Sequence, residues 1–372
     1  MDQNQTRRQL LAGVGMAGAV GLAGCTAQTL VGGDGSGDGD ESENGETDQS
    51  ADDDSEYFHS GEAIPSYPYG DVEIDPTEST ADPDAENPVF TVDDIDDERF
   101  GELLFAADPF LFVEENEWHM FVEVVERGHG GRIVHAESDD EGLTWEYNGV
   151  VLEEEWHLSF PLPFKWNGEY YMTTQANPSS RPPRLYKANS FPDEWFPVLD
   201  GYYDQNEYDH GINDHAVFHW NDMWWDIAGD ANEDTYIYYN DTLETDGWQP
   251  HSDNPVVEDR PFGSRPGGRP LVFEDRIFIP YQQTEDLYGE SIQGYWITEL
   301  TEDAYEDEHI GAVLEATGRY TAEDEPAWNS LRMHHYDPWY LGEGDGWRAA
   351  VDGDKFETEG ANWSVGIYHT PE

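Results

Sequence analysis

Two aspartates are the residues of this sequence best placed for acid–base chemistry. Asp108 precedes the apolar run PFLFV, and Asp214 precedes HAVFHW. Other polar or titratable residues open or flank three further runs: His157, Ser159, Arg265, Arg269, His334 and His335. Two carboxyl groups that converge from different elements could divide proton donation and proton acceptance between them. The chemistry therefore depends on a fold that brings these distant positions together.

The same positions recur within a repeated pattern. The stretch AADPFLFVEENEWHMFVEV (106–124) has an alternating apolar strand, a polar turn and a second apolar strand. The pattern returns in four further copies, the last two looser, which begin at Ser159, Asn213, Arg265 and Leu331. Equivalent phenylalanines, Phe112, Phe164 and Phe218, are 52 and then 54 residues apart. A period of this size is typical of a solenoid or a propeller, with one supersecondary unit per repeat.

The repeats predict an all-β fold, a five-bladed β-propeller with four-stranded antiparallel blades. Two more strand-like runs follow most of the hairpins, and no convincing amphipathic helix appears among them. The fifth repeat has no fourth strand after residues 362–370, so we expect the early segment 88–92 to pair with it and close the ring. The first strand of each blade lines the central channel. Alignment of the copies then places Asp108, Phe160, Asp214 and Gly267 at one level of that channel.

The composition is extremely acidic. The 372 residues contain 82 Asp and Glu against 17 Lys and Arg, which gives a formal net charge of −65. The acidity continues through the aromatic-rich repeats, so disorder alone does not explain it. Concentrated salt screens such self-repulsion, with a Debye length of about 3 Å at 1 M, and the charge therefore predicts a halophilic, archaeal protein. It argues against nucleic acid as a partner, because phosphate neutralisation needs a basic face.

The N-terminal region predicts export and anchoring. Arg7-Arg8 precedes a short apolar run that ends in Leu22-Ala23-Gly24-Cys25, as in a twin-arginine signal with a lipid-attachment site. Cys25 is the one cysteine, which rules out an intrachain disulfide. We expect a signal at 1–25, a disordered acidic linker at 26–87 and the propeller at 88–372. Lipidation of Cys25 would hold the protein at the extracellular face of the cell membrane, with no other membrane contact.

Several motifs resemble a known family. ADPFLF, which begins at Ala107, and NDHAVFHWNDMWW (213–225) are similar to five-bladed propellers of the glycoside hydrolase 43 type. WHLSFPLPF (156–164), NGEYYM (167–172) and SRPGGR (264–269) resemble more closely the N-terminal propeller of glucosamine inositolphosphorylceramide transferases and their prokaryotic relatives. The likeness covers roughly residues 100–353. It implies a carbohydrate-active protein whose partner is a glycan or glycoconjugate.

The resemblance also implies roles for the two aspartates. Asp108 occupies the place of the general base, and Asp214 that of an aspartate that tunes the acid and orients the substrate. The general acid of the hydrolases is a glutamate at the start of the fourth blade, where this sequence has Ser264-Arg265-Pro266-Gly267. Hydrolysis, which needs both carboxyl groups, would therefore require another donor, such as His157, His215 or a loop glutamate.

The two arginines of the fourth repeat leave two functions open. Arg265 and Arg269 either bind an anionic glycan, since guanidinium groups match carboxylates and phosphates, or they pair with acids and carbonyls and hold the blades together. The protein is accordingly either a glycosidase or a non-catalytic module for glycan binding or surface-polymer assembly. The residues predicted to contact the ligand are His157, Ser159, His215, Arg265, Arg269 and His335.

The histidines do not define a metal site. His215 and His219 are four residues apart, which places them on one face of a helix and also of a strand. No metalloprotease-type motif accompanies them, and such residues more often fill a channel or core. The resemblance leaves open a calcium ion in the central channel, without assigned ligands; no other cofactor is expected. The protein is expected to be a monomer.

Overall fold

The computed structural model describes residues 72–177, 183–201, 211–318, 326–355 and 361–372. The predicted export signal, the lipid-attachment residue Cys25 and the linker up to residue 71 lie outside the described residues. Within these described ranges, no helix has the length and apolar character needed to cross a membrane.

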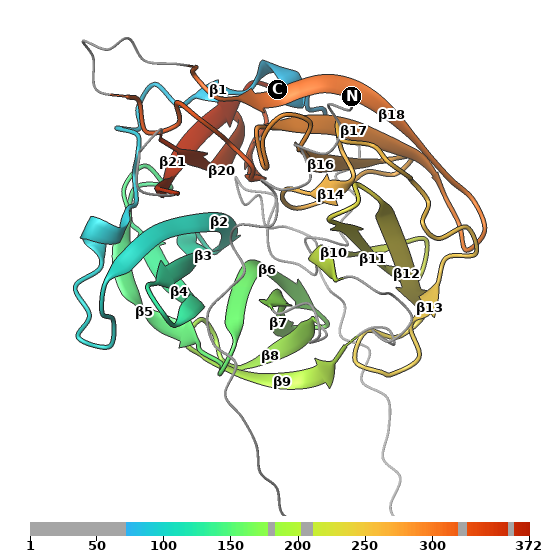
Figure 1. Ribbon diagram of the computed structural model, residues 1–372, viewed down its shortest axis with the longest axis horizontal. Helices are drawn as coiled ribbons and strands as arrows, with labels where there is room; N and C mark the ends of the chain where they lie inside the picture. Colours follow the sequence, from blue (N-terminus) through green and yellow to red (C-terminus); the bar gives the residue numbers. More distant parts are fainter. Residues whose placement is uncertain (1–71, 178–182, 202–210, 319–325, 356–360) are drawn as a thin grey trace, which may run out of the picture. The chain divides into compact units, whose positions relative to one another are not determined.

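The described residues form the five four-stranded antiparallel blades that the sequence predicts. Blade 1 contains β2 (Leu103–Glu114), β3 (Glu117–Glu126), β4 (Gly130–Ser138) and β5 (Glu146–Leu152). Blade 2 contains β6 (His157–Trp166), β7 (Glu169–Asn177), β8 (Arg184–Ser190) and β9 (Glu194–Asp200). Blade 3 contains β10 (Ile212–Trp220), β11 (Met223–Asp230), β12 (Thr235–Asn240) and β13 (Gln249–Pro250). In these three blades the strands pair in chain order, from the inner β2, β6 and β10 to the outer β5, β9 and β13 (Figure 1).

Blades 4 and 5 depart from this simple order. Blade 4 has a divided inner strand, and its members are β14 (Arg265–Pro266), β15 (Leu271–Val272), β16 (Ile277–Gln283), β17 (Ser291–Leu300) and β18 (Tyr305–Glu315). Blade 5 contains β19 (Tyr336–Gly342), β20 (Gly346–Asp354), β21 (Trp363–Thr370) and β1 (Thr80–Ala81). Two short 3₁₀ helices, η1 (Pro76–Glu78) and η2 (Val92–Asp94), precede blade 1.

The ring is closed by the N-terminal part of the folded chain. β1 pairs with β21 through Thr80 and Ala81. The predicted closing segment 88–92 also reaches this strand, where the Val365 N–H donates to the Phe90 carbonyl at 2.9 Å. The closure is therefore confirmed at Phe90, and an earlier strand extends it. Ile74 is buried as well, so the folded part begins before residue 88.

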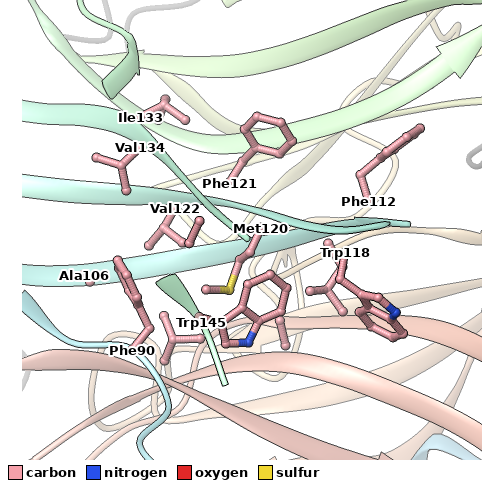
Figure 2. Close-up of a cluster of buried hydrophobic side chains, with 14 of the residues drawn as sticks. Phe90, Ala106, Phe112, Trp118, Met120, Phe121, Val122, Ile133, Val134 and Trp145 are labelled. Carbon is pink, nitrogen blue, oxygen red and sulfur yellow. The ribbon is translucent and has the colours of Figure 1, made fainter. Parts of the chain in front are cut away.

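Hydrophobic clusters join each blade to its neighbours. The largest combines Phe90, Trp118 and Met120 with Trp339 of blade 5 (Figure 2 shows its blade 1 side chains). Three further clusters contain residues of blades 2 and 3, of blades 3 and 4, and of blades 4 and 5. Because each sheet buries both faces against adjacent sheets, its strands carry near-continuous apolar runs, which explains why the aromatic pattern could be read as a repeat.

Candidate functional site

The inner strands of blades 1, 2 and 3 share an irregularity at the position predicted to line the channel. Asp108, Phe160 and Asp214 have φ values of 50°, 50° and 58°. In each blade the strand register shifts at this residue, so each occupies a β-bulge. A non-glycine residue in this left-handed region costs roughly 1–3 kcal/mol, and bulges often re-aim side chains beside active sites. The predicted level of equivalent residues is thus a level of equivalent bulges.

Blade 4 reaches the same level by a different route. Its inner strand breaks between β14 and β15, and Gly268 there has a φ of 148°. A Cβ on Gly268 would lie 1.9 Å from the Tyr336 carbonyl oxygen of blade 5, so only glycine fits this approach. The adjacent Gly267 carbonyl accepts a hydrogen bond from the Tyr336 N–H at 2.7 Å. At the position that the repeat alignment gives to Gly267, blade 4 therefore contributes only backbone groups and no acidic side chain.

The Asp108 carboxyl group is buried among other carboxyl groups. It accepts a hydrogen bond from the Phe160 N–H at 3.2 Å, and the Asp108 N–H donates to Asp352 Oδ2 at 3.2 Å. Burial raises the pKa of Asp108 well above its ordinary value, and the charges of Glu123, Asp214 and Asp352 raise this pKa further, while Arg265 opposes them. The environment therefore favours the protonated form of Asp108 to a higher pH than for an ordinary aspartate.

Asp214 has more hydrogen-bond donors around it than Asp108 has. Arg265 Nε donates to Asp214 Oδ2, and Gln282 Nε2 donates to the same oxygen at 2.8 Å. The Asp214 N–H donates to Gln175 Oε1 at 3.3 Å. The Arg265 guanidinium also lies over the Tyr288 ring, 5.1 Å from its centroid. Burial opposes the charge of Arg265, and Asp214 and Tyr288 raise its pKa despite that. Arg265 is thus committed to Asp214 inside the site.

The predicted opening of blade 5 contributes two histidines with different surroundings. His334 Nδ1 lies 2.6 Å from Asp352 Oδ2, and its ring stacks on Trp363 at 3.9 Å. His335 is fully buried, with its ring 4.4 Å from that of Phe110, and burial lowers its pKa to about 3. His335 Nδ1 lies 3.8 Å from Asp108 Oδ1. His335 is therefore a buried group beside Asp108 whose neutral form is favoured.

Asp108, His334 and Asp352 are the described central residues that could hold a metal ion. One ligand atom from each lies within 4.8 Å of the others. His334 and Asp352 already bind each other, both through the ring and through the His334 N–H, which donates to Asp352 Oδ1 at 3.0 Å. The ring contact is an ion-pair distance only, because His334 Nδ1 forms no aligned hydrogen bond with a described residue. Calcium in the channel stays a prediction, and no ligand is assigned to it.

A further carboxylate, Glu123 of β3, was not identified from the sequence. Glu123 Oε1 lies 3.0 Å from His157 Nε2, and the charge of Glu123 raises the pKa of Asp108. One signal was present, because Glu123 is the one acidic residue in the apolar run from Trp118 to Val125. Charged residues are rarely buried without a partner, so an acid within such a strand marks a candidate site.

The remaining predicted ligand residues have internal partners or positions. Arg269 is fully buried and donates to Asp337 Oδ1, the Leu111 carbonyl and the Pro163 carbonyl at 2.7–2.9 Å. These contacts favour the alternative in which this arginine holds the blades together. His215 is buried with Nδ1 2.8 Å from Asp226 Oδ2, which is a core pair within blade 3. Ser159 is buried directly before the bulge at Phe160.

Comparison with known protein families identifies the repeat region. The model described as "Glucosamine inositolphosphorylceramide transferase 1, N-terminal" matches residues 57–354. Glucosamine inositolphosphorylceramide transferase 1 of Oryza sativa subsp. japonica is 34% identical over 260 residues, which are 68% of this chain and 33% of the relative. The protein of that name from Arabidopsis thaliana is 32% identical over 261 residues, covering 68% and 32%. The chain thus spans about a third of the length of these relatives.

Solved structures agree on the fold. A putative glycoside hydrolase from Parabacteroides distasonis superimposes with a TM-score of 0.57 over 80% of this chain and 97% of that one, at 12% identity. The catalytic domain of the GH62 α-L-arabinofuranosidase from Coprinopsis cinerea gives 0.56 over 74% and 92%, at 13% identity. At such low identity these likenesses establish a shared architecture alone.

Proposed function

The chain belongs to the family of the N-terminal domain of glucosamine inositolphosphorylceramide transferase 1, and from this premise we propose that its propeller is a carbohydrate-active site that hydrolyses a glycosidic bond. The relatives are named for the transfer of an amino sugar. Propellers of similar fold include an α-L-arabinofuranosidase. The observation that carries the proposal is the Asp108 carboxyl group, buried at a channel-lining bulge among the charges of Glu123, Asp214 and Asp352.

Asp108 serves as the proton donor in this proposal. The resemblance assigned the general base to this position, but a base must be ionised before it can accept a proton. Burial and, after it, the neighbouring carboxylates raise the pKa of Asp108, and a carboxylic acid kept protonated in this way can protonate a leaving oxygen. Asp214, held by Arg265 and Gln282, orients the substrate and presents an acceptor to its hydroxyl groups.

The charges of the site favour a neutral or cationic glycan over an anionic one. Arg265 is bound to Asp214, and Arg269 is bound to Asp337 and to two carbonyls. All three guanidinium nitrogens of Arg269 are thus occupied, and Arg265 already shares its charge with Asp214. An anionic ligand would also meet the carboxylates of Glu123 and Asp352, and like charges oppose its binding. We therefore favour a neutral or cationic glycan over the anionic glycan that the sequence left open.

A non-catalytic glycan-binding module is the second candidate. It is favoured by the fourth blade, which brings Arg265 and glycine backbone to the centre where the hydrolases have a glutamate. The same buried polar groups would then recognise sugar hydroxyls without turnover. Fold alone does not choose between the two, because propellers support many functions.

The two candidates separate when turnover and binding are measured together. Wild type, Asp108→Asn and Asp214→Asn are compared in molar KCl on a panel of neutral, amino-sugar and acidic surface polysaccharides. Hydrolysis by wild type that falls roughly 10²–10⁴-fold in Asp108→Asn, with binding retained, supports the enzyme. If wild type and both variants bind a polysaccharide but none of the three hydrolyses it, the non-catalytic glycan-binding module is supported. Retention of full activity by Asp108→Asn contradicts the proposed role of that residue.

The location and the salt dependence belong to the same proposal. The protein acts at the extracellular face of the membrane of a halophile, anchored by a lipid on Cys25 after twin-arginine export. Cys25→Ser should release the protein into the medium, and unchanged membrane retention would refute the anchor. The net charge of −65 should make the fold dependent on salt. Equal melting temperatures in dilute buffer and in molar KCl would refute the halophilic adaptation.

A further inference from the structure

Glu123 is a buried acid with a single strong partner. Side chains alternate along a strand, so Glu117, His119, Phe121 and Glu123 share one face of β3. Glu117 at the turn is exposed, whereas the Glu123 side chain is only 7% exposed. Burying a carboxylate is costly unless it is paired. The partner of Glu123 is His157 of the neighbouring blade, whose Nε2 lies 3.0 Å from Glu123 Oε1.

The backbone of blade 1 fixes the proton on this histidine. The Gly131 N–H donates to His157 Nδ1 at 2.8 Å, so Nδ1 accepts and carries no hydrogen. The ring proton is therefore on Nε2, which donates to Glu123 Oε1. Gly131 permits this arrangement, because a Cβ there would lie 2.3 Å from the Leu158 carbonyl oxygen and 2.9 Å from Glu123 Oε1. His157 thus has both ring nitrogens occupied and cannot itself deliver a proton to a ligand.

The same strand pairing brings Glu123 beside Asp108. Ala107 is the register partner of Glu123 on β2, and Asp108 is the bulge residue that follows it. Among the described residues, hydrogen bonds to Glu123 reach Oε1 from His157, and none is formed at Oε2. An oxygen left over in this way, next to a protonated carboxyl group, is suited to accept a proton from water.

We propose that Glu123 is the base of this site and that His157 positions it, which supplies the second proton-transfer carboxyl group that the fourth blade lacks. The inference rests on the hydrolytic function proposed above. Glu123 accepts one proton from a water molecule as the water oxygen bonds to the anomeric carbon. The bond from that carbon to the leaving oxygen breaks, and the leaving oxygen takes the proton of Asp108. Transfer of one proton from Glu123 to Asp108 then restores the starting state, with one water consumed.

Substrates with different leaving groups test these roles separately. The glycan that wild type cleaves is compared with the 2,4-dinitrophenyl glycoside of the sugar released, for Glu123→Ala, Asp108→Ala and the control Glu117→Gln. A dinitrophenolate leaves without protonation, so Asp108→Ala should recover most of its rate on that substrate. Glu123→Ala should stay roughly 10²–10⁴-fold slow in kcat on both substrates, with KM little changed. Added formate, which supplies an external carboxylate, should restore Glu123→Ala and leave Asp108→Ala unchanged. Glu117, on the same strand face but exposed, should be dispensable.

His157 is tested by a conservative pair of variants. His157→Gln keeps a side-chain N–H that can donate to Glu123, and should retain more activity than His157→Ala at equal circular dichroism. Full activity of Glu123→Ala while Asp108→Ala is inactive overturns the inference and leaves the proposed function standing. Absence of formate rescue at Glu123 also overturns it. Absence of hydrolysis by wild type overturns both.

Discussion

Arg265 and Arg269 lie in one short segment of the fourth blade, yet they meet two different kinds of surroundings. Arg269 is fully buried, and its guanidinium bonds to Asp337 and to the carbonyls of Leu111 and Pro163, so charge and hydrogen bonds balance. Arg265 reaches Asp214 in a group that also contains Asp108. We call Arg269 with Asp337 and the two carbonyls the Arg269 clamp. We call the group formed by Asp108, Glu123, Asp214, Asp352 and Arg265 the Asp108 centre.

The difference between them separates structural burial from functional burial. The Arg269 clamp joins inner-strand residues of blades 1, 2 and 5 to blade 4 and leaves no polar group of Arg269 to bind a ligand. In the Asp108 centre, burial and the surplus of carboxyl groups over cations raise the pKa of Asp108. An excess of buried carboxyl groups over cations destabilises the fold, but it shifts pKa values in the way that acid–base chemistry requires.

The largest effect on stability is expected at the clamp. Arg269→Met leaves Asp337 as a buried charge without its partner, along with two buried carbonyls. Breaking such a pair should lower the free energy of unfolding by about 3–5 kcal/mol, measured by urea denaturation in molar KCl. Arg127→Ala is the matched control, since the Arg127 and Glu102 side chains are 62% and 65% exposed; it should change stability by about 0.5 kcal/mol or less. A small effect of Arg269→Met would mean that the blades do not depend on the clamp.

A smaller loss of stability is expected at the second arginine. In Arg265→Gln, Asp214 keeps Gln282 as a donor, so the cost should be about 1–3 kcal/mol. Arg265 also lowers the pKa of Asp108, and the variant should therefore bind the Asp108 proton more tightly than wild type. Equal losses in Arg265→Gln and Arg269→Met would remove the distinction between the two centres.

The Asp108 centre should make the free energy of unfolding fall as the pH rises, and this slope against pH distinguishes it from the Arg269 clamp. Between about pH 3.9, where a free aspartate ionises, and the raised pKa of folded Asp108, the unfolded chain has lost this proton and the folded chain keeps it. The stabilising contribution is full below that window, and it falls by about 1.4 kcal/mol per pH unit as the pH rises through it. Asp108→Asn should lack this fall. From about pH 4 upward, the unfolding free energy of wild type should therefore decrease relative to that of the variant. Parallel stability curves would contradict the raised pKa.

The propeller could be predicted from the sequence because its cause is local. Each blade repeats the same aromatic strand, turn and strand, and Phe112, Phe164 and Phe218 fall on equivalent buried positions. The inner-strand level of Asp108 and Asp214 follows from the same alignment. These features need only the strand period and the repeat spacing.

The contacts between blades could not be predicted in the same way. Glu123 meets His157 across two blades, and Arg269 reaches carbonyls at Leu111 and Pro163 that carry no side-chain signal. The bulges at Asp108 and Phe160 also leave no signal in the sequence. A non-glycine residue with positive φ is held in that conformation by its surroundings and not by its own preference. Side-chain partners of this kind depend on how neighbouring blades pack, and the sequence pattern of a single repeat does not predict that packing.

The most direct test of the account is the ionisation of Asp108 itself. Carboxyl carbons of labelled protein are followed by NMR from pH 3 to pH 9 in molar KCl, with Asp108→Asn used to assign the signal. We predict that the Asp108 signal titrates well above the ordinary pKa of about 3.9, and that Glu123→Gln moves its midpoint downward, since the Glu123 charge raises this pKa. An ordinary midpoint that does not respond to Glu123→Gln would contradict it.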